Sequence, residues 1–417
     1  MTISSKWHGI DLNDDQLTML DWLRQFCEKE IRPAAAKYDK SQETPWDIIK
    51  KAADSGIYSL EFFGQLFFGD PTGVTAALAI EELFFADPGI ALALFGTGLP
   101  AAAIMANGTD AQKMEWLPKC FVGAKGEPVL AAFATSESGA GSDVSGMRTR
   151  AVYNKKTDTW TLNGTKDWIT NGAISAPEGG ITGLHVVVAV VDPKLGSRGQ
   201  ASFIVPAGTK GLSQGTKHHK LGFRASHTAE VVLDNVVVPG NCLLGGKEAL
   251  DGRLVKARAG QSSGGQAAMA TFEGTRWMVA AMGVGLARAA YEHARDYAVQ
   301  REQFGKPIAQ HQQVALMLAE LDTSIDAARL LVIDAAHKYM SGAKLLRAEG
   351  SKAKYFATEL AVKATRYAVQ ILGGAGYVDE HPVERWYRDA PLLTIFEGTT
   401  QVQVNLIASV GTGLRIR

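Results

Sequence analysis

The first third of the chain carries apolar residues at the spacing of amphipathic helices. Within 17–26, leucine or phenylalanine recurs every three residues, and Asn13 or Asp14 can cap the helix that they predict. Two continuous apolar segments follow at 74–85 and 90–105, and both are predicted to be helices. We expect no apolar stretch of membrane-spanning length, because charged residues and a proline interrupt this run, at Glu81, Glu82, Asp87 and Pro88.

From about residue 129 the pattern changes to short segments rich in Val, Ile and Thr. Turns rich in Asn, Gly and Asp separate them, and the predicted strands are 147–153, 159–163, 185–192, 201–206 and 229–239. Because no helices lie between them, the pattern favours an antiparallel sheet or barrel over a dinucleotide-binding βαβ unit. The glycine run at 139–142 lacks the strand and helix that a dinucleotide fingerprint requires.

Helical patterns return after residue 243. The segment 273–300 is apolar nearly all round, which predicts a helix buried between other helices. Two long helices are predicted at 312–339 and 348–372, the second ending at Gly373-Gly374, and a shorter one begins near Thr400. We therefore predict an α+β multidomain fold. Its parts are an N-terminal α-helical domain (1–127), a middle antiparallel β-barrel or sheet domain (128–243) and a C-terminal four-helix bundle (244–417).

Composition and charge narrow the function. A chain of 417 residues suits about two or three domains. Lys plus Arg equals Asp plus Glu at 43 each, so no global field attracts nucleic acid or a membrane. Three scattered cysteines, with no signal-peptide or presequence pattern at the N-terminus, predict a cytoplasmic protein. No metal-ligand spacing is found; His311 stands beside two glutamines.

Glu397 is the leading candidate for acid–base chemistry. It lies between apolar neighbours and Gly398-Thr399-Thr400, which is typical of a helix start. Apolar flanks remove water from the carboxylate, disfavour its charged form and raise its pKa towards the range of a working base. The free N–H groups of the following helix would suit an anion. A buried, hydrogen-bonded Glu at a loop–helix junction is the alternative interpretation.

Four further motifs accompany Glu397. They are 133–143 (FATSESGAGSD), 166–172 (KDWITNG), 301–305 (REQFG) with His311-Gln312, and 370–376 (QILGGAG). With the 394–403 segment, their order and spacing resemble the acyl-CoA dehydrogenase family, the flavoenzymes that oxidise acyl-CoA thioesters to 2-enoyl-CoA. The resemblance extends from about Asp11 to the C-terminus. It implies the same helical, β and helical domain layout.

The resemblance implies a function. Glu397 would abstract the α-proton of an acyl-CoA, FAD would accept the β-hydride at N5 to give the trans-2-enoyl-CoA, and an electron-transfer flavoprotein would take the electrons. Some relatives carry the base on the buried helix, where this chain has Thr275, which cannot serve as a base. An acyl-CoA oxidase that uses O2 is the runner-up. A DNA-binding relative would need a basic surface, which the balanced charge disfavours.

The resemblance also assigns cofactor and substrate contacts. The flavin ring would meet Phe133, Thr135, Ser136, Trp168 and Thr170. The FAD of a neighbouring subunit, in a homotetramer built as a dimer of dimers, would be reached by Arg301, Gln303, Phe304, His311, Gln312, Gln370, Gly373 and Gly374. Thr399 and Gln401 would also lie at the cofactor, and the acyl-CoA would contact Ser142, Phe95, Glu273, Arg276 and Gly398. For Trp168 a place in the sheet core is the alternative, and for Arg276 an ion pair with Glu273 or another carboxylate.

Two segments depart from the family pattern. Residues 59–69 contain four phenylalanines where relatives carry a Pro-Glu-Glu-Tyr-Gly-Gly-like stretch, and 247–263 is longer than usual. The bulk of Phe95 and the Phe-rich segment, with no arginine at Ile90 for a second carboxylate, predicts a compact, uncharged acyl group.

Overall fold

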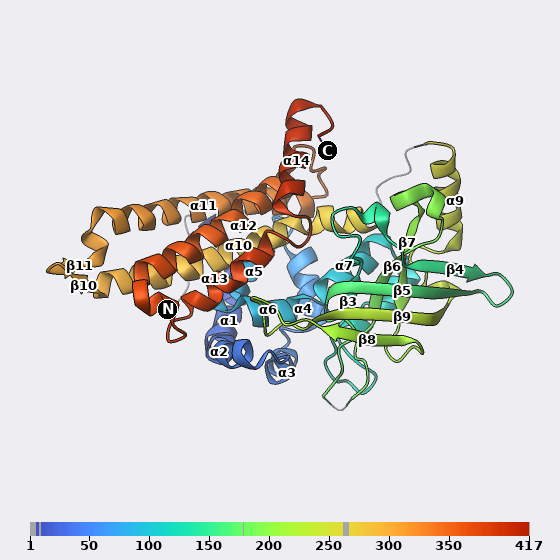
Figure 1. The fold of residues 1–417 in the computed structure, drawn as a ribbon, viewed down its shortest axis with the longest axis horizontal. Coiled ribbons are helices and arrows are strands. Elements are labelled where there is room, and N and C mark those ends of the chain that lie inside the picture. The colour runs from blue at the N-terminus through green and yellow to red at the C-terminus, as the bar shows by residue number, and fades with distance from the viewer. Residues whose placement is uncertain (1–5, 8–9, 178, 262–266, 417) are drawn as a thin grey trace.

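The computed structural model describes the chain except residues 1–5, 8–9, 178, 262–266 and 417, and describes only the backbone of 6–7 and 267–273. Helices from the N-terminal and C-terminal parts of the sequence pack together, and the β-sheet lies at one end of the molecule (Figure 1). The predicted fold class, with an N-terminal helical, a middle β and a C-terminal helical part, is confirmed. The helical part changes to the β part between Cys120 and Ala132. The bounds of the three domains, at 1–127, 128–243 and 244–417, stay a prediction.

The N-terminal part is helical, after a short hairpin of β1 (Lys6–Trp7) and β2 (Ile10–Asp11). Its helices are α1 (Asp14–Phe26), α2 (Arg32–Ser41), α3 (Trp46–Asp54), α4 (Leu60–Gly64), α5 (Val74–Ala86), α6 (Pro88–Phe95), α7 (Gly98–Asn107) and α8 (Asp110–Trp116). Asn13 caps α1, because its Oδ1 accepts from Gln16 N, and Gln16 Oε1 accepts from Asn13 N in return, which completes a capping box. The apolar face of α1 then packs on α5.

We expected no apolar stretch long enough to span a membrane, and by length and composition alone this expectation was wrong. The stretch Pro88–Asn107, which holds α6 and α7, covers 20 residues and is apolar enough to span a bilayer. However, 67% of the 18 residues that make up its apolar part are buried inside the protein, and Ile90 and Ala93 are fully buried. The stretch therefore has the character of core helix.

The middle part is a mixed sheet. Its strands are β3 (Ala132–Ala134), β4 (Arg150–Asn154), β5 (Thr159–Thr170), β6 (His185–Val190), β7 (Gln200–Val205), β8 (Leu212–Lys217) and β9 (Thr228–Pro239). The order is β3-β6-β4-β5-β9-β8, with β7 also paired to β6. The prediction of a wholly antiparallel sheet needs correction, because β3 pairs with β6 in parallel and β4 touches β6 in the same sense.

Most predicted strands differ from the observed ones by three residues or fewer at either end, whereas β5 and β8 depart further from the prediction. Strand β5 runs 12 residues, to Thr170, because bulges in its pairing with β9 carry it past the predicted end. Strand β8 has no counterpart among the predicted strands. It lies at the edge of the sheet, and only its first residue, Leu212, is buried, so its sequence lacks the apolar alternation of a core strand.

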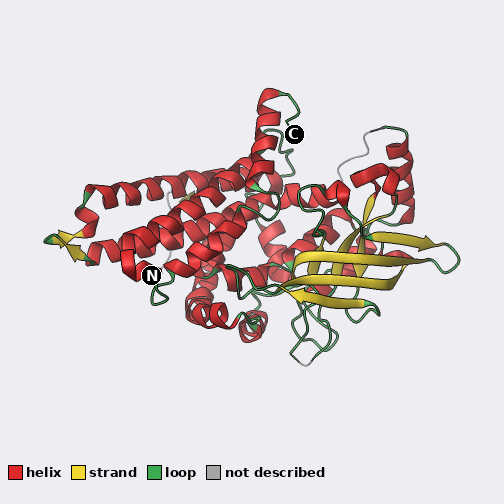
Figure 2. Cartoon of the chain, in the orientation of Figure 1, coloured by secondary structure: helices red, strands yellow, loops and turns green. Residues whose placement is uncertain are grey.

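The C-terminal part is a bundle of long helices (Figure 2). The elements are α9 (Lys247–Arg258), α10 (Ala267–Gln300), β10 (Glu302–Gln303), β11 (Lys306–Pro307), α11 (Gln312–Met340), α12 (Glu349–Leu372), α13 (Val383–Leu393) and α14 (Thr400–Thr412). Helix α10 lies against α5, α11 and α12, and its residues 277–290 are all buried, as its apolar sequence predicts. The long 247–263 segment is helical over α9, where Arg258 pairs with Asp192 at 2.7 Å.

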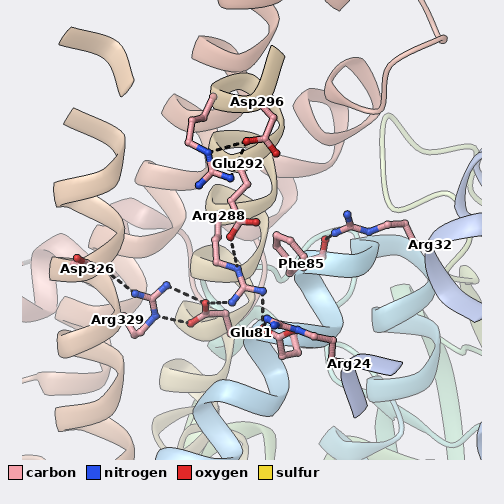
Figure 3. A network of polar contacts seen from close by, with 11 residues as sticks. Arg24, Arg32, Glu81, Phe85, Arg288, Glu292, Asp296, Asp326 and Arg329 are labelled. Atoms are coloured by element: carbon pink, nitrogen blue, oxygen red, sulfur yellow. Dashed lines mark hydrogen bonds and ion pairs between the residues drawn. The ribbon is translucent and has the colours of Figure 1, made fainter. Parts of the chain in front are cut away.

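A buried network of charges joins the N-terminal helices to the bundle (Figure 3). Arg288 on α10 donates to Glu81 at 2.7 Å and to Glu82 at 2.5 Å. Arg329 on α11 donates to Glu81 at 2.9 Å, and Arg24 on α1 donates to Glu82 at 2.9 Å. Since buried charges must be paired, this network explains how two adjacent glutamates sit inside the apolar helix α5.

Candidate active site

Glu397 stands in a turn between α13 and α14 whose backbone is left-handed. Its φ is 52°, and the next residue, Gly398, has a φ of 91°. A side chain in this region costs roughly 1–2 kcal/mol, and such strain persists where surrounding contacts fix it. A Cβ at Gly398 would come within 2.5 Å of Gln403 Nε2, so this position requires glycine.

The carboxyl group of Glu397 has a hydroxyl partner and cationic neighbours. Thr275 Oγ1 on α10 donates to Glu397 Oε2 at 2.6 Å. Burial raises the pKa of the Glu397 carboxyl, while the Thr275 bond and the charges of Lys354 and Arg276 lower it in part. The carboxyl group is therefore desolvated, while the residue as a whole keeps partial exposure. This combination suits a proton acceptor.

Two buried side chains hold the backbone of this turn. Lys354 on α12 donates from Nζ to the carbonyl oxygens of Leu393 and Gly398, at 3.0 and 2.9 Å. Gln403 on α14 donates from Nε2 to Gly398 O at 2.9 Å and to Glu397 O at 3.4 Å. Both side chains are fully buried.

Thr399 begins α14 as its N-cap. Its Oγ1 accepts from Val402 N at 3.4 Å, so of the two predicted caps, Thr399 and Thr400, the first is the observed one. Thr400 instead donates to Glu359 at 2.6 Å. Gln401, in the first turn of α14, is exposed.

Arg276 is buried beside this turn. Its Nη1 donates to Ser351 Oγ on α12 at 3.3 Å, and its charge acts on Glu397 and Lys354. The predicted partner Glu273 lies outside the residues whose side chains the structure describes. Its pairing with Arg276, and its predicted role beside the acyl-CoA, stay predictions.

The 133–136 segment, on the middle sheet, holds a second group of the predicted site residues. Phe133 and Thr135 are buried, Ser136 is partly exposed, and Ser136 O accepts from Asp167 N at 2.9 Å. Within the described part of the chain, Thr135 Oγ1 is buried without a hydrogen-bond partner. A buried hydroxyl is normally satisfied, so this atom fits a ligand that offers an acceptor or donor.

A buried ion pair stiffens that segment. Lys166 on β5, fully buried, donates from Nζ to Thr135 O and to Glu137 Oε1, both at 2.9 Å. Glu137 in turn accepts from the backbone N–H groups of Arg148 and Thr149. Burial lowers the pKa of Lys166 to about 8, and Glu137 acts in the opposite direction. The segment is therefore fixed before any ligand arrives.

Trp168 projects from β5 and does not join the sheet core. Its exposed fraction is 53%, its φ is 58°, and its ring stacks beside that of His218. Asp167 Oδ1 accepts from Trp168 N at 2.9 Å and contacts His218 Nε2 at 2.7 Å, which fixes the turn. Thr170 follows at the end of β5, partly exposed. An exposed indole held in place offers a flat apolar surface to a planar ligand.

The REQFG motif forms the β10–β11 hairpin at the free end of the bundle. Phe304 is 94% exposed with a φ of 53°, and its ring meets His311 edge to face. His311 Nε2 contacts Gln303 O at 3.1 Å. Arg301 and Gln312 are also exposed. Figure 1 shows this hairpin and the middle sheet at opposite ends of the molecule.

The remaining predicted residues are spread over the surface and the core. Gln370, Gly373 and Gly374 are exposed at the end of α12. Ser142 is exposed in a loop that Asp143 closes by accepting from Ser145 N at 3.0 Å.

Phe95 is buried and stacks on Phe63 with ring centroids 5.1 Å apart, near Phe67. Within the Phe-rich segment, Phe62, Phe63 and Leu66 are thus core, Phe67 is partly buried and Phe68 is 71% exposed. The structure therefore brings Glu397, Gly398, Thr399 and Arg276 together. It leaves the hairpin residues far from the sheet.

Sequence reasoning missed the residues that hold the two regions in place. These are Lys354, Gln403, Lys166 and Glu137. For Lys354 a signal existed, because it occupies the same helical face as Ser351, Ala357 and Thr358, which are all buried. A lysine on the buried face of a predicted helix calls for a specific partner. The others carry no periodic signal.

Known proteins resemble this chain over nearly its whole length. Models of the N-terminal, middle and C-terminal domains of acyl-CoA dehydrogenase match residues 13–124, 132–236 and 262–411. An acyl-CoA dehydrogenase of Bacillus subtilis is 38% identical over 399 residues, which is 95% of this chain and 98% of that protein.

Solved structures agree. Butyryl-CoA dehydrogenase from Megasphaera elsdenii is 34% identical with a TM-score of 0.83, over 97% of this chain and 99% of that one. A glutaryl-CoA dehydrogenase from Mycobacterium smegmatis in complex with FADH2 is 27% identical with a TM-score of 0.81, over 97% and 96%. The chain therefore belongs to the acyl-CoA dehydrogenase family of flavoprotein oxidoreductases.

Proposed function

We propose that this protein oxidises an acyl-CoA thioester to the trans-2-enoyl-CoA, with Glu397 as the base that removes the α-proton. The observation that carries the proposal is the Glu397 carboxyl group itself. Burial desolvates it, and the Thr275 hydroxyl donates to it at 2.6 Å. Its backbone is held in a left-handed turn, and the chain belongs to this family. A saturated carbon beside a thioester is a very weak acid, so its deprotonation needs a positioned base in a site that excludes water.

FAD, when bound, would supply the acceptor for the β-hydride. We assign its flavin ring to Phe133, Thr135, Ser136, Trp168 and Thr170. The buried, unpartnered hydroxyl of Thr135 and the half-exposed ring of Trp168 support this assignment, because both suit a planar ligand with polar edges. For the substrate, we assign the backbone N–H of Glu397 to the thioester carbonyl and Ser142 to the CoA moiety, as the family resemblance suggests.

We propose that FAD also binds across a subunit interface in a homotetramer, a dimer of dimers. Arg301, Gln303, Phe304, His311 and Gln312 lie around a hairpin at the opposite end of the molecule from the middle sheet, so we assign them to the FAD of a neighbouring chain (Figure 1). We assign Gln370, Gly373, Gly374, Thr399 and Gln401 to the same cofactor. Electrons would pass to an electron-transfer flavoprotein in the cytoplasm.

A panel of acyl-CoAs tests the reaction. We expect the purified protein to be yellow with FAD in each subunit, and its flavin to bleach anaerobically with a compact, uncharged substrate such as butyryl-CoA or isobutyryl-CoA. Phe95 and Phe63 add bulk in the N-terminal helices, and the buried Ile90 offers no charge to a second carboxylate.

Higher kcat/KM for palmitoyl-CoA or glutaryl-CoA than for every compact substrate would refute this substrate class. No bleaching with any acyl-CoA would refute the reaction. Rapid recolouring on admission of air would instead identify an oxidase.

Arg301→Ala tests the shared cofactor site. Guanidinium groups bind phosphates through paired donors, so we expect the variant to lose FAD affinity and to dissociate towards smaller assemblies together. FAD content by absorbance and mass by light scattering are measured side by side. Arg295→Ala, an exposed arginine of α10 paired with Asp296 at 2.8 Å, is the control and should keep both properties. Loss of FAD from an intact tetramer would contradict the coupling.

A further inference from the structure

A buried cation that the proposed reaction does not use holds the turn of Glu397. Lys354 lies on α12 with an exposed fraction of 0%, and its Nζ donates to Leu393 O at 3.0 Å and to Gly398 O at 2.9 Å. Leu393 is the last residue of α13, and Gly398 directly follows Glu397. One ammonium group therefore ties the end of the incoming helix to the far side of the turn. Cations also suit the C-terminal ends of helices, where carbonyl groups are free.

The same turn has a second, neutral support. Gln403 on α14 is also fully buried and donates to Gly398 O at 2.9 Å and to Glu397 O at 3.4 Å. Gly398 O thus accepts from one side chain of α12 and one of α14. The left-handed φ of Glu397 is a conformation that persists only where such contacts determine it. Because the side chain leaves the backbone from this residue, the turn sets the direction of the carboxylate.

The charge of Lys354 acts on Glu397 as well. It lowers the pKa of the Glu397 carboxyl, as does Arg276 from α10, against the larger effect of burial. Burial is the largest influence on the pKa of Lys354 and lowers it. Glu397 and Glu359 raise this pKa, Arg276 lowers it, and together these influences bring it to about 8. The two supports therefore differ, because loss of Lys354 removes a donor and a charge, and loss of Gln403 removes a donor alone.

We propose that Lys354 is a positioning residue for the proposed base: with Gln403 it fixes the turn that aims the carboxylate and the backbone N–H of Glu397. The inference rests on the role proposed for Glu397. It places no bond-making step on Lys354, whose ammonium group is occupied by two carbonyl oxygens.

Lys354→Met tests this directly, because methionine fills similar space without a charge or an N–H group. We expect the rate of anaerobic flavin reduction to fall by about 10–10²-fold, as small displacements of reacting groups do, with FAD content and acyl-CoA affinity retained. The acidic limb of the pH–rate profile should move to higher pH, since a cation near Glu397 is lost. Lys354→Arg, which keeps charge and donors, should recover part of the rate and return the limb.

Matched variants separate this role from simple stability. Lys363→Met removes a lysine from the same helix, where it pairs with Glu320, and should leave rate and pH profile unchanged. Gln403→Met should slow the reaction with the limb unmoved, because an amide carries no charge. If Lys354→Met matched Lys363→Met in rate and profile, whatever its melting temperature, the proposal would be overturned.

Two further measurements keep the test decisive. If Lys354→Met does not fold, the shorter and uncharged Lys354→Gln replaces it, and a wild-type rate of flavin reduction with a wild-type pH profile would overturn the proposal. Glu397→Gln is measured beside these variants. A fast Glu397→Gln enzyme would reject the base assignment itself, whereas a slow Glu397→Gln with a wild-type Lys354→Met would reject the positioning role alone.

Discussion

Replacing Glu397 with glutamine is expected to slow flavin reduction by acyl-CoA by at least about 10²–10⁴-fold, the usual contribution of a positioned general base. Glutamine keeps the shape of the side chain and can still accept from Thr275, whose hydroxyl lies 2.6 Å from the carboxylate. FAD and acyl-CoA should therefore bind as before. Because departure of the hydride depends on removal of the α-proton, the loss should appear in the chemical step. Stopped-flow reduction under anaerobic conditions measures it.

A carboxylate restored from the neighbouring helix should recover part of that rate. Thr275→Glu in the Glu397→Gln background places an acid on α10, at the residue that already contacts position 397. Glu359→Gln is a matched control, since Glu359 is an exposed carboxylate that accepts from Thr400 at the start of α14. It should keep the wild-type rate. Near-normal flavin reduction by Glu397→Gln would show that another group is the base.

Arg288→Met is expected to destabilise the fold by about 3–5 kcal/mol, the usual cost of removing one partner from a buried ion pair. Arg288 is buried on α10, and its guanidinium bonds Glu81 and Glu82 and lies over the ring of Phe85 (Figure 3). Without it, the buried carboxylates lose a shared cation, although Glu81 keeps its pair with Arg329 and Glu82 its pair with Arg24. Thermal and denaturant unfolding should both show the loss.

The surrounding network supplies controls. Arg295→Met alters an exposed pair with Asp296 on the same helix and should change stability by less than about 1 kcal/mol. The double variant Arg288→Met/Glu81→Gln should lose less stability than the sum of the losses of the two single variants. The reason is that Glu81→Gln removes a negative charge that Arg288→Met leaves under-compensated. A stability of Arg288→Met equal to that of Arg295→Met would contradict the proposed weight of the network.

Local sequence determined much of the fold. The helical spacing in α1 and the all-round apolar sequence of α10 predict those elements, because burial on one face or on all faces leaves a periodic record. The Glu397 segment also predicts its own helix start, since capping acts within about three residues. Strand β8 and the parallel pairing of β3 escaped prediction because an edge strand and a three-residue strand carry too little pattern.

By itself, then, the sequence determined the long helices, most strands of the sheet, the candidate base and the motifs of the family. Only the tertiary structure decided how that base is held. Glu397 contacts Thr275, which lies 122 positions away in the sequence, and Gly398 contacts Lys354, which lies 44 positions away. No local periodicity encodes contacts over such separations. The exposed ring of Trp168 follows in the same way from packing, as does the place of the Phe304 hairpin at the opposite end of the molecule from the middle sheet. Hydrophobic patterns specify which face is buried, whereas the partner that it meets depends on the whole chain.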